Sequence, residues 1–79
     1  MNYQPVAEWP DSSPALSPEP LTEAELRVAA LMMEGWDNAD IAAQLCLSLN
    51  TVKKHVGQVL AKLDARNRTH AVVLLLRRD

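Results

Sequence analysis

The polar side chains that could do chemistry are concentrated in one stretch of the chain, between Leu49 and Leu63. They are amides, hydroxyls, ammonium groups and an imidazole: Asn50, Thr51, Lys53, Lys54, His55, Gln58 and Lys62. Such groups donate hydrogen bonds to phosphates and to base edges in the major groove of DNA. No nucleophile is accompanied by a base with a supporting residue, and no glycine loop could cradle a phosphate. The predicted chemistry is therefore binding, and an enzyme is not expected.

The charge of the chain is segregated along its length. Residues 1–20 carry three acidic and no basic side chains, residues 21–52 five acidic and one basic, and residues 53–79 two acidic and seven basic. The net charge of −2 thus conceals a basic C-terminal third. Basic side chains gathered in this way favour a nucleic-acid partner, although an ordinary solvated face would look the same.

Local signals predict four helices and no strand, an all-α fold. Thr22 and Glu25 fit a capping box that begins a helix over about 23–34, which Gly35 ends. A helix over about 38–45 is capped by Asp37 or Asn38. A third runs over about 49–63 and is ended by Asp64, and Asn67 caps a fourth over about 68–77.

The helix over 49–63 has two different faces. Apolar residues at spacings of three and four form a stripe that predicts packing against the other helices: Val52, Val56, Val59, Leu60 and Leu63. The opposite face shows Asn50, Thr51, Lys53, Lys54, Gly57, Gln58 and Lys62. In the turn before this helix, Ser48 is expected to be its cap, Leu47 to plug the core, and Cys46 to be a small buried apolar residue.

Residues 1–20 are predicted to be a disordered, acidic, Pro-rich tail or linker, because they hold all five prolines and few residues that could form a periodic apolar face. Residues 21–79 are left to fold as one small domain. The single cysteine excludes an internal disulfide, and no Cys/His cluster has metal-ligand spacing, so no metal or cofactor is expected. The longest apolar run, residues 71–76, is too short to cross a membrane, and a cytoplasmic location is expected.

The order and spacing of particular residues resemble the LuxR-type (GerE-like) DNA-binding domain of bacterial transcription regulators. That family shows LT-x-x-E, then EG-x-x-N-x-x-IA-x-x-L-x-x-S, TVK-x-H and KL-x-x-RNRT-x-A. The matching positions, without a gap, begin at Leu21, Thr22 and Glu25 and continue through Glu34, Gly35, Asn38, Ile41, Ala42, Leu45, Ser48, Thr51, Val52, Lys53, His55, Lys62, Leu63, Arg66, Asn67, Arg68, Thr69 and Ala71.

The resemblance implies a four-helix, helix-turn-helix fold that binds double-stranded DNA for transcription regulation. Its third helix, about 49–63, would enter the major groove, and its fourth, about 68–77, would pair two protomers on half-sites with dyad symmetry. Such domains usually follow a receiver or ligand-binding domain. The chain is then either a stand-alone regulator or an output domain that retains its linker.

The resemblance also suggests residue roles. Lys53 and Lys54 occupy positions that contact base edges or lie next to them, whereas Thr51 is expected to contact phosphate. His55 is either a groove contact or a packed, hydrogen-bonded histidine. Gly57 departs from the family, whose members often have a longer side chain there that reaches into the groove. Gln58 is therefore expected to take a larger part in binding base or phosphate. Arg68 is expected to tie the fourth helix to the first, through Glu25 or Asp64, more than to touch DNA.

Six consecutive apolar residues, 71–76, exceed what one buried helix face needs. Val72, Val73 and Leu76 are therefore predicted at a dimer seam, with additional core packing as the alternative. Two other functions remain open: a helix-turn-helix co-opted to bind a protein partner, and a module like region four of sigma factors. The RNRT-x-A segment argues against the second.

Overall fold

The computed structural model describes residues 20–77, which form four helices. These are α1 (Glu23–Met33), α2 (Asn38–Leu45), α3 (Leu49–Leu63) and α4 (Arg68–Arg77). The prediction of an all-α fold is confirmed, and within residues 20–77 there is no strand. The predicted bounds match for α2, α3 and α4, while α1 ends one residue earlier than predicted. The tail predicted for residues 1–20 lies outside the described residues except for Pro20.

Each helix begins at a side chain that caps it, as the sequence predicted. The amide of Glu25 donates to Oγ1 of Thr22 over 3.2 Å, and the amide of Thr22 donates to Oε1 of Glu25 over 2.9 Å. The caps of α2, α3 and α4 are Asp37, Ser48 and Asn67, whose side-chain oxygens accept from backbone amides three residues on. Each such cap stabilises its helix by about 1 kcal/mol.

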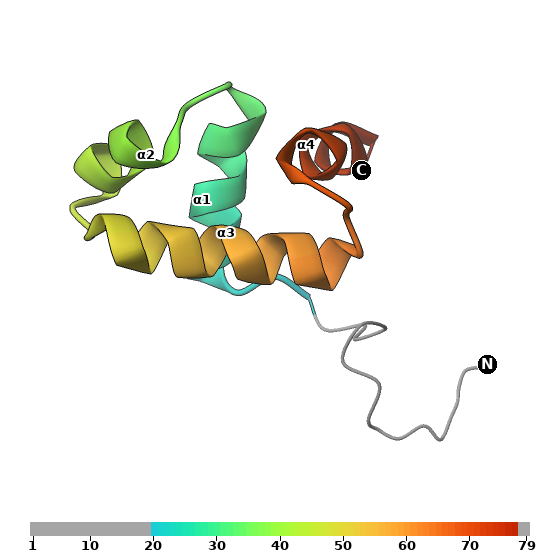
Figure 1. Cartoon of the computed structure of the whole chain (residues 1–79), viewed down its shortest axis with the longest axis horizontal. Coiled ribbons are helices and arrows are strands. Elements are labelled where there is room, and N and C mark those ends of the chain that lie inside the picture. Colours follow the sequence, from blue (N-terminus) through green and yellow to red (C-terminus); the bar gives the residue numbers. More distant parts are fainter. Residues whose placement is uncertain (1–19, 78–79) are drawn as a thin grey trace, which may run out of the picture.

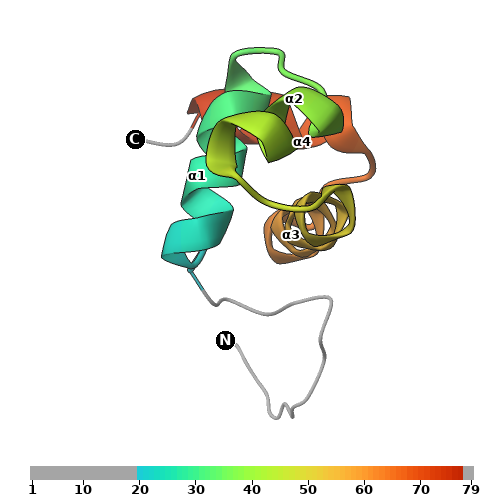
Figure 2. The same cartoon turned by 90° about the vertical axis from the view of Figure 1, so that its left-hand side faces the viewer.

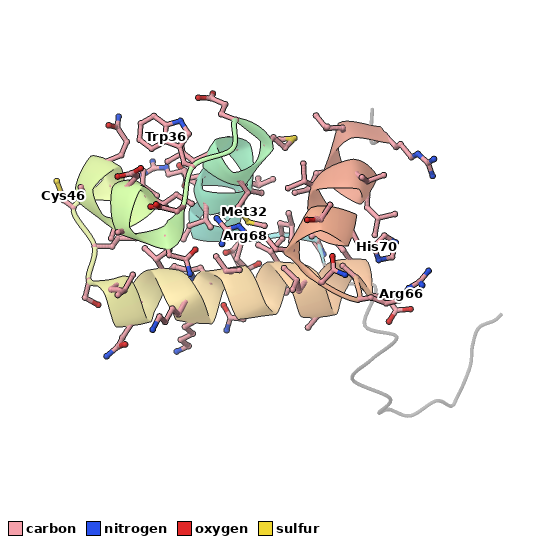
Figure 3. The ribbon with its side chains drawn as sticks, turned by 45° about the horizontal axis from the view of Figure 1, so that its top comes forward. Met32, Trp36, Cys46, Arg66, Arg68 and His70 are labelled. Carbon is pink, nitrogen blue, oxygen red and sulfur yellow. The ribbon has the colours of Figure 1, made fainter. Side chains whose placement is uncertain are left out.

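Three of the helix ends are left-handed turns. Gly35 has φ 88°, Cys46 58° and Asp64 55°. The predicted ends at Gly35 and Asp64 are confirmed, but the prediction for Cys46 is wrong, because its side chain is exposed. Cys46 follows the last turn of α2, and Figure 3 shows it at the outer edge of the molecule. Leu47 is also 37% exposed and does not plug the core.

The core lies where α1, α2 and α4 meet one side of α3. The largest fully buried side chains come from the first three helices: Val28, Met32, Ile41, Val52 and Val59. Ala71 and Leu75 bring α4 to the same cluster. Figure 1 shows α2, α4 and most of α1 above α3, and Figure 2, turned by 90°, shows α1 beside α3 with α2 and α4 above it. No described helix covers the opposite side, which is called the open face of α3 below.

Candidate nucleic-acid interface

The open face of α3 carries the first set of predicted binding residues. Asn50, Lys53 and Lys54 are all exposed. Residues three and four apart lie on one side of a helix, so these side chains project together from its first two turns. Gly57 and Ala61 continue the exposed row toward the C-terminal end of α3. The structure thus brings Asn50, Lys53 and Lys54 together on a surface that the bundle does not use.

The charge on this surface is positive. Helix α3 contains no carboxylate. Among residues 20–77 the ion pairs join Arg27 to Glu23 and Lys62 to Glu25, so neither Lys53 nor Lys54 is paired there. Two ammonium groups without an internal partner attract an anionic ligand, and no ion pair within residues 20–77 has to break when they bind it.

Thr51 lies at the start of α3, fixed by its cap. Its amide donates to Oγ of Ser48 over 3.1 Å, and the Ser48 hydroxyl donates to Oγ1 of Thr51 over 2.8 Å. Thr51 is half-buried. The first turn of a helix also directs its unsatisfied amides outward, where they favour an anion. Thr51 is therefore held by its hydrogen bonds at the N-terminal end of α3, where a negatively charged ligand would be favoured.

His55 and Gln58 lie at the margin of the open face, and both are half-buried. Nδ1 of His55 is buried, and within the described part of the chain it has no hydrogen-bond partner. The sequence suggested a packed, hydrogen-bonded histidine as one alternative for His55. The side chain is packed, but its Nδ1 makes no hydrogen bond to the described residues.

Lys62 was predicted to bind DNA from the polar face of α3, but its side chain is turned toward α1. Its Nζ donates to Oε1 of Glu25 over 2.8 Å and to the carbonyl oxygen of Pro20 over 3.3 Å. Its side chain is only 16% exposed. Lys62 therefore joins α3 to the start of α1 and is not part of the row formed by Asn50, Lys53 and Lys54.

Glu25 is the buried partner in this ion pair, and its side chain is 3% exposed. Burial acts to raise the pKa of Glu25, but the hydrogen bond from Lys62, the amide of Thr22 and the charge of Lys62 together outweigh it. The pKa of Glu25 consequently lies below its ordinary value of 4.5. The carboxylate thus stays ionised at neutral pH and holds both the cap of α1 and Lys62.

Arg68 has the structural role that was predicted, but with other partners. Its guanidinium donates to Oδ1 of Asn38 and, over 2.7 Å, to the carbonyl oxygen of Trp36. The predicted partners, Glu25 and Asp64, are therefore corrected. In Figure 3, Arg68 reaches from the start of α4 toward Trp36 and the start of α2. This contact orients α2, and hence the turn into α3, relative to α4.

The three residues predicted at a dimer seam lie on α4, but they differ in exposure. Val72 is half-buried and packs against the core. Val73 and Leu76 are 41% and 64% exposed. Because they are three residues apart, they lie on one face of α4. The alternative of extra core packing thus fits Val72, whereas Val73 and Leu76 leave apolar surface in water.

The described residues contain neither a membrane-spanning helix nor a cluster of metal-binding side chains. None of the helices there is long and apolar enough to cross a membrane. Residues 20–77 also hold no group of three or more His, Cys, Asp or Glu side chains arranged to bind a metal ion.

Helix α2, the turn at residues 46–48 and helix α3, supported by α1 and α4, define a helix-turn-helix domain. Residues 19–75 match the GerE family, described as bacterial regulatory proteins of the luxR family. Because the match covers most of the chain, this protein belongs to that family, as the motifs indicated.

Similar proteins include longer bacterial regulators. An uncharacterized transcriptional regulatory protein of Bacillus subtilis, YxjL, is 48% identical over 59 residues, which are 75% of this chain and 27% of that protein. The transcriptional regulatory protein LiaR of the same organism is 42% identical over 59 residues, 75% of this chain and 28% of LiaR. The response regulator protein VraR of Staphylococcus aureus is 40% identical over 55 residues, 70% of this chain and 26% of VraR. The chain thus spans about a quarter of the length of these relatives.

Proposed function

We propose that this chain binds double-stranded DNA sequence-specifically and regulates transcription, with α3 in the major groove. The observation that carries the proposal is the open face of α3, where Asn50, Lys53 and Lys54 are exposed and the two lysines have no ion-pair partner in residues 20–77. A fifteen-residue helix is about 22 Å long and, with its side chains, about 10–12 Å across, so it fits along a major groove about 12 Å wide. The family match and the names of the relatives support the same function.

The side chains of the first two turns of α3 carry the recognition. Lys53 and Lys54 donate to O6 and N7 of guanine or neutralise phosphate, and Asn50 pairs with the edge of adenine. Thr51, with the first amides of α3, contacts phosphate. His55 and Gln58 contribute from the margin of the face, and Lys62 keeps α3 in place through Glu25.

Two copies of the chain bind together, through the exposed face of α4. Val73 and Leu76 form the seam, with Val72 at its inner edge. Their exposure supports this role, since burying apolar side chains against a second copy removes them from water. A pair related by a two-fold axis places two α3 helices on half-sites about one turn of DNA apart. The DNA target therefore has dyad symmetry.

The proposal is tested by titrating the chain with a pool of random-sequence duplexes at several salt concentrations. Binding should weaken with salt at a log–log slope of several units, about −0.9 for each phosphate neutralised. The double variant Lys53→Ala/Lys54→Ala should remain folded, bind more weakly and have a shallower slope. Arg27→Ala is the matched control, because Arg27 is an exposed cation on α1 that already pairs with Glu23.

Two results would overturn the proposal. The first is a double variant that binds duplex DNA as tightly as the parent chain. The second is a chain that binds no duplex at low salt, which would favour the alternative of a helix-turn-helix used to hold a protein partner.

A further inference from the structure

Helix α3 begins with a leucine that the core does not use. Leu49 is the first residue of α3, directly after the cap Ser48, and it is 42% exposed. The buried positions of this helix begin at Val52 and continue with Val56 and Val59. Leu49 is not among the half-buried residues that pack against the core. Packing against the core therefore leaves much of this apolar side chain in water.

The location of Leu49 places it beside the proposed binding residues. Residues four apart are neighbours on a helix surface, so Leu49 lies one turn before Lys53, as Asn50 lies one turn before Lys54. Leu49 is also three residues before the buried Val52, so it lies where the buried stripe of α3 borders the open face, at the N-terminal end of the helix. In the docking geometry of helix-turn-helix proteins, the N-terminal residues of the recognition helix contact base edges.

An apolar side chain in the major groove has one matching group on the bases. The edges of guanine, cytosine and adenine present hydrogen-bond donors and acceptors there, whereas thymine adds the methyl group on C5. The geometry points to Leu49 as a specificity-determining residue that contacts the 5-methyl group of a thymine. This inference rests on the proposed function, and it adds an A·T base pair to the half-site.

The spacing along α3 also sets where this thymine lies. Four residues of helix span about 6 Å, and successive base pairs are about 3.4 Å apart. Leu49 and Lys53 thus face bases about two steps apart. The thymine is expected within about two base pairs of the base that Lys53 contacts.

The experiment uses a duplex obtained by repeated selection with the full chain from random-sequence DNA. Each thymine of the selected half-site is replaced in turn by uracil, which removes the methyl group and keeps every hydrogen-bonding group. Binding of each duplex is measured for the parent chain and for Leu49→Ala. At one thymine, uracil should weaken binding by the parent about fourfold, the value of one buried methylene-sized group. At the same position Leu49→Ala should bind both duplexes equally.

The comparison removes other effects of the methyl group. Any change in DNA shape acts on both proteins alike and cancels between them. Leu26→Ala is the matched control, because Leu26 is a leucine on α1 that is 51% exposed, and it should respond to uracil as the parent does. Leu49→Val, which keeps an apolar side chain, should keep part of the discrimination. Circular dichroism establishes that each variant is folded.

The outcomes separate the inference from the proposed function. If every uracil substitution costs the parent and Leu49→Ala the same, or if the selected half-site contains no thymine, the inference is overturned while DNA binding stands. If no duplex is bound at low salt, the proposed function fails and the inference fails with it.

Discussion

Nζ of Lys62 lies 2.8 Å from Oε1 of Glu25, and this ion pair joins the last turns of α3 to the first turn of α1. The same carboxylate accepts the Thr22 amide in the capping box of α1. One buried acid therefore fixes both a helix start and the position of the helix proposed to enter DNA. This contact lies away from the open face of α3 and joins the helix to α1.

Replacing Lys62 should destabilise the domain without altering its contacts with DNA. Lys62→Met keeps most of the apolar stem but leaves the carboxylate of Glu25 buried without its cation, which should lower the free energy of unfolding by about 1–3 kcal/mol. Urea denaturation measures this. Lys53→Ala, at an exposed position, should change stability by no more than about 0.5 kcal/mol.

The same variant separates two roles for Lys62. Where Lys62→Met is still folded, its salt slope for duplex binding should equal that of the parent, because the ammonium is already engaged with Glu25. A shallower slope, like the one expected for Lys53→Ala/Lys54→Ala, would show that Lys62 contacts DNA after all.

The lowered pKa of Glu25 predicts how stability changes in acid. In the unfolded chain Glu25 binds a proton as the pH falls through about 4.5, and in the folded chain it does so only at lower pH. The stabilisation is therefore fully present above 4.5 and is lost as the pH falls through the lowered folded value. Glu25→Gln keeps a side chain that can complete the capping box but has no charge.

Denaturation of the parent and of Glu25→Gln at pH 7, 5, 4 and 3 measures this effect. The parent should be the more stable at pH 7, and the difference should shrink below pH 4.5. The other carboxylates are present in both proteins and cancel. A difference that is constant from pH 7 to pH 3 would show that the ionised form of Glu25 is not what the fold stabilises.

Most helix bounds could be predicted because the signals that set them are local. Thr22, Ser48 and Asn67 each cap a helix through an amide only three residues away. The stripe of valines on α3 likewise shows within a single helix which side packs inward. These features need no knowledge of the other helices.

Most of what could not be predicted depends on how distant segments meet. Glu25 and Lys62 are 37 residues apart, and nothing in either segment identifies the other as its partner. Arg68 was expected to pair with an acidic side chain, but it donates to the side-chain oxygen of Asn38 and to the backbone carbonyl oxygen of Trp36, at the start of α2. Cys46 was expected to be buried from its residue type, yet its left-handed position after α2 leaves it exposed.

Gly57 offers a test of the open face that does not remove a charge. A Cβ added at Gly57 meets no atom within 4 Å. Because alanine favours a helix interior over glycine by about 1 kcal/mol, Gly57→Ala should raise the free energy of unfolding by about that amount. Ala61→Gly, one turn further on the same exposed face, should lower it by a similar amount. Loss of stability in Gly57→Ala would contradict the open surroundings of this position.

The exposed face of α4 predicts how binding depends on a second copy. Leu76→Glu places a charge on a side chain that is 64% exposed, so the monomer should remain folded. A carboxylate buried against a second copy would cost several kcal/mol, and cooperative binding to a duplex with two half-sites should therefore fall. Affinity for a single half-site should change little. Ala43→Glu adds the same charge to an exposed position on α2, which Figure 1 shows at the far end of the molecule from α4, and it should retain cooperativity. If Leu76→Glu occupies both half-sites as cooperatively as the parent, the two copies do not meet through α4, because no pairing across this face could tolerate the buried charge.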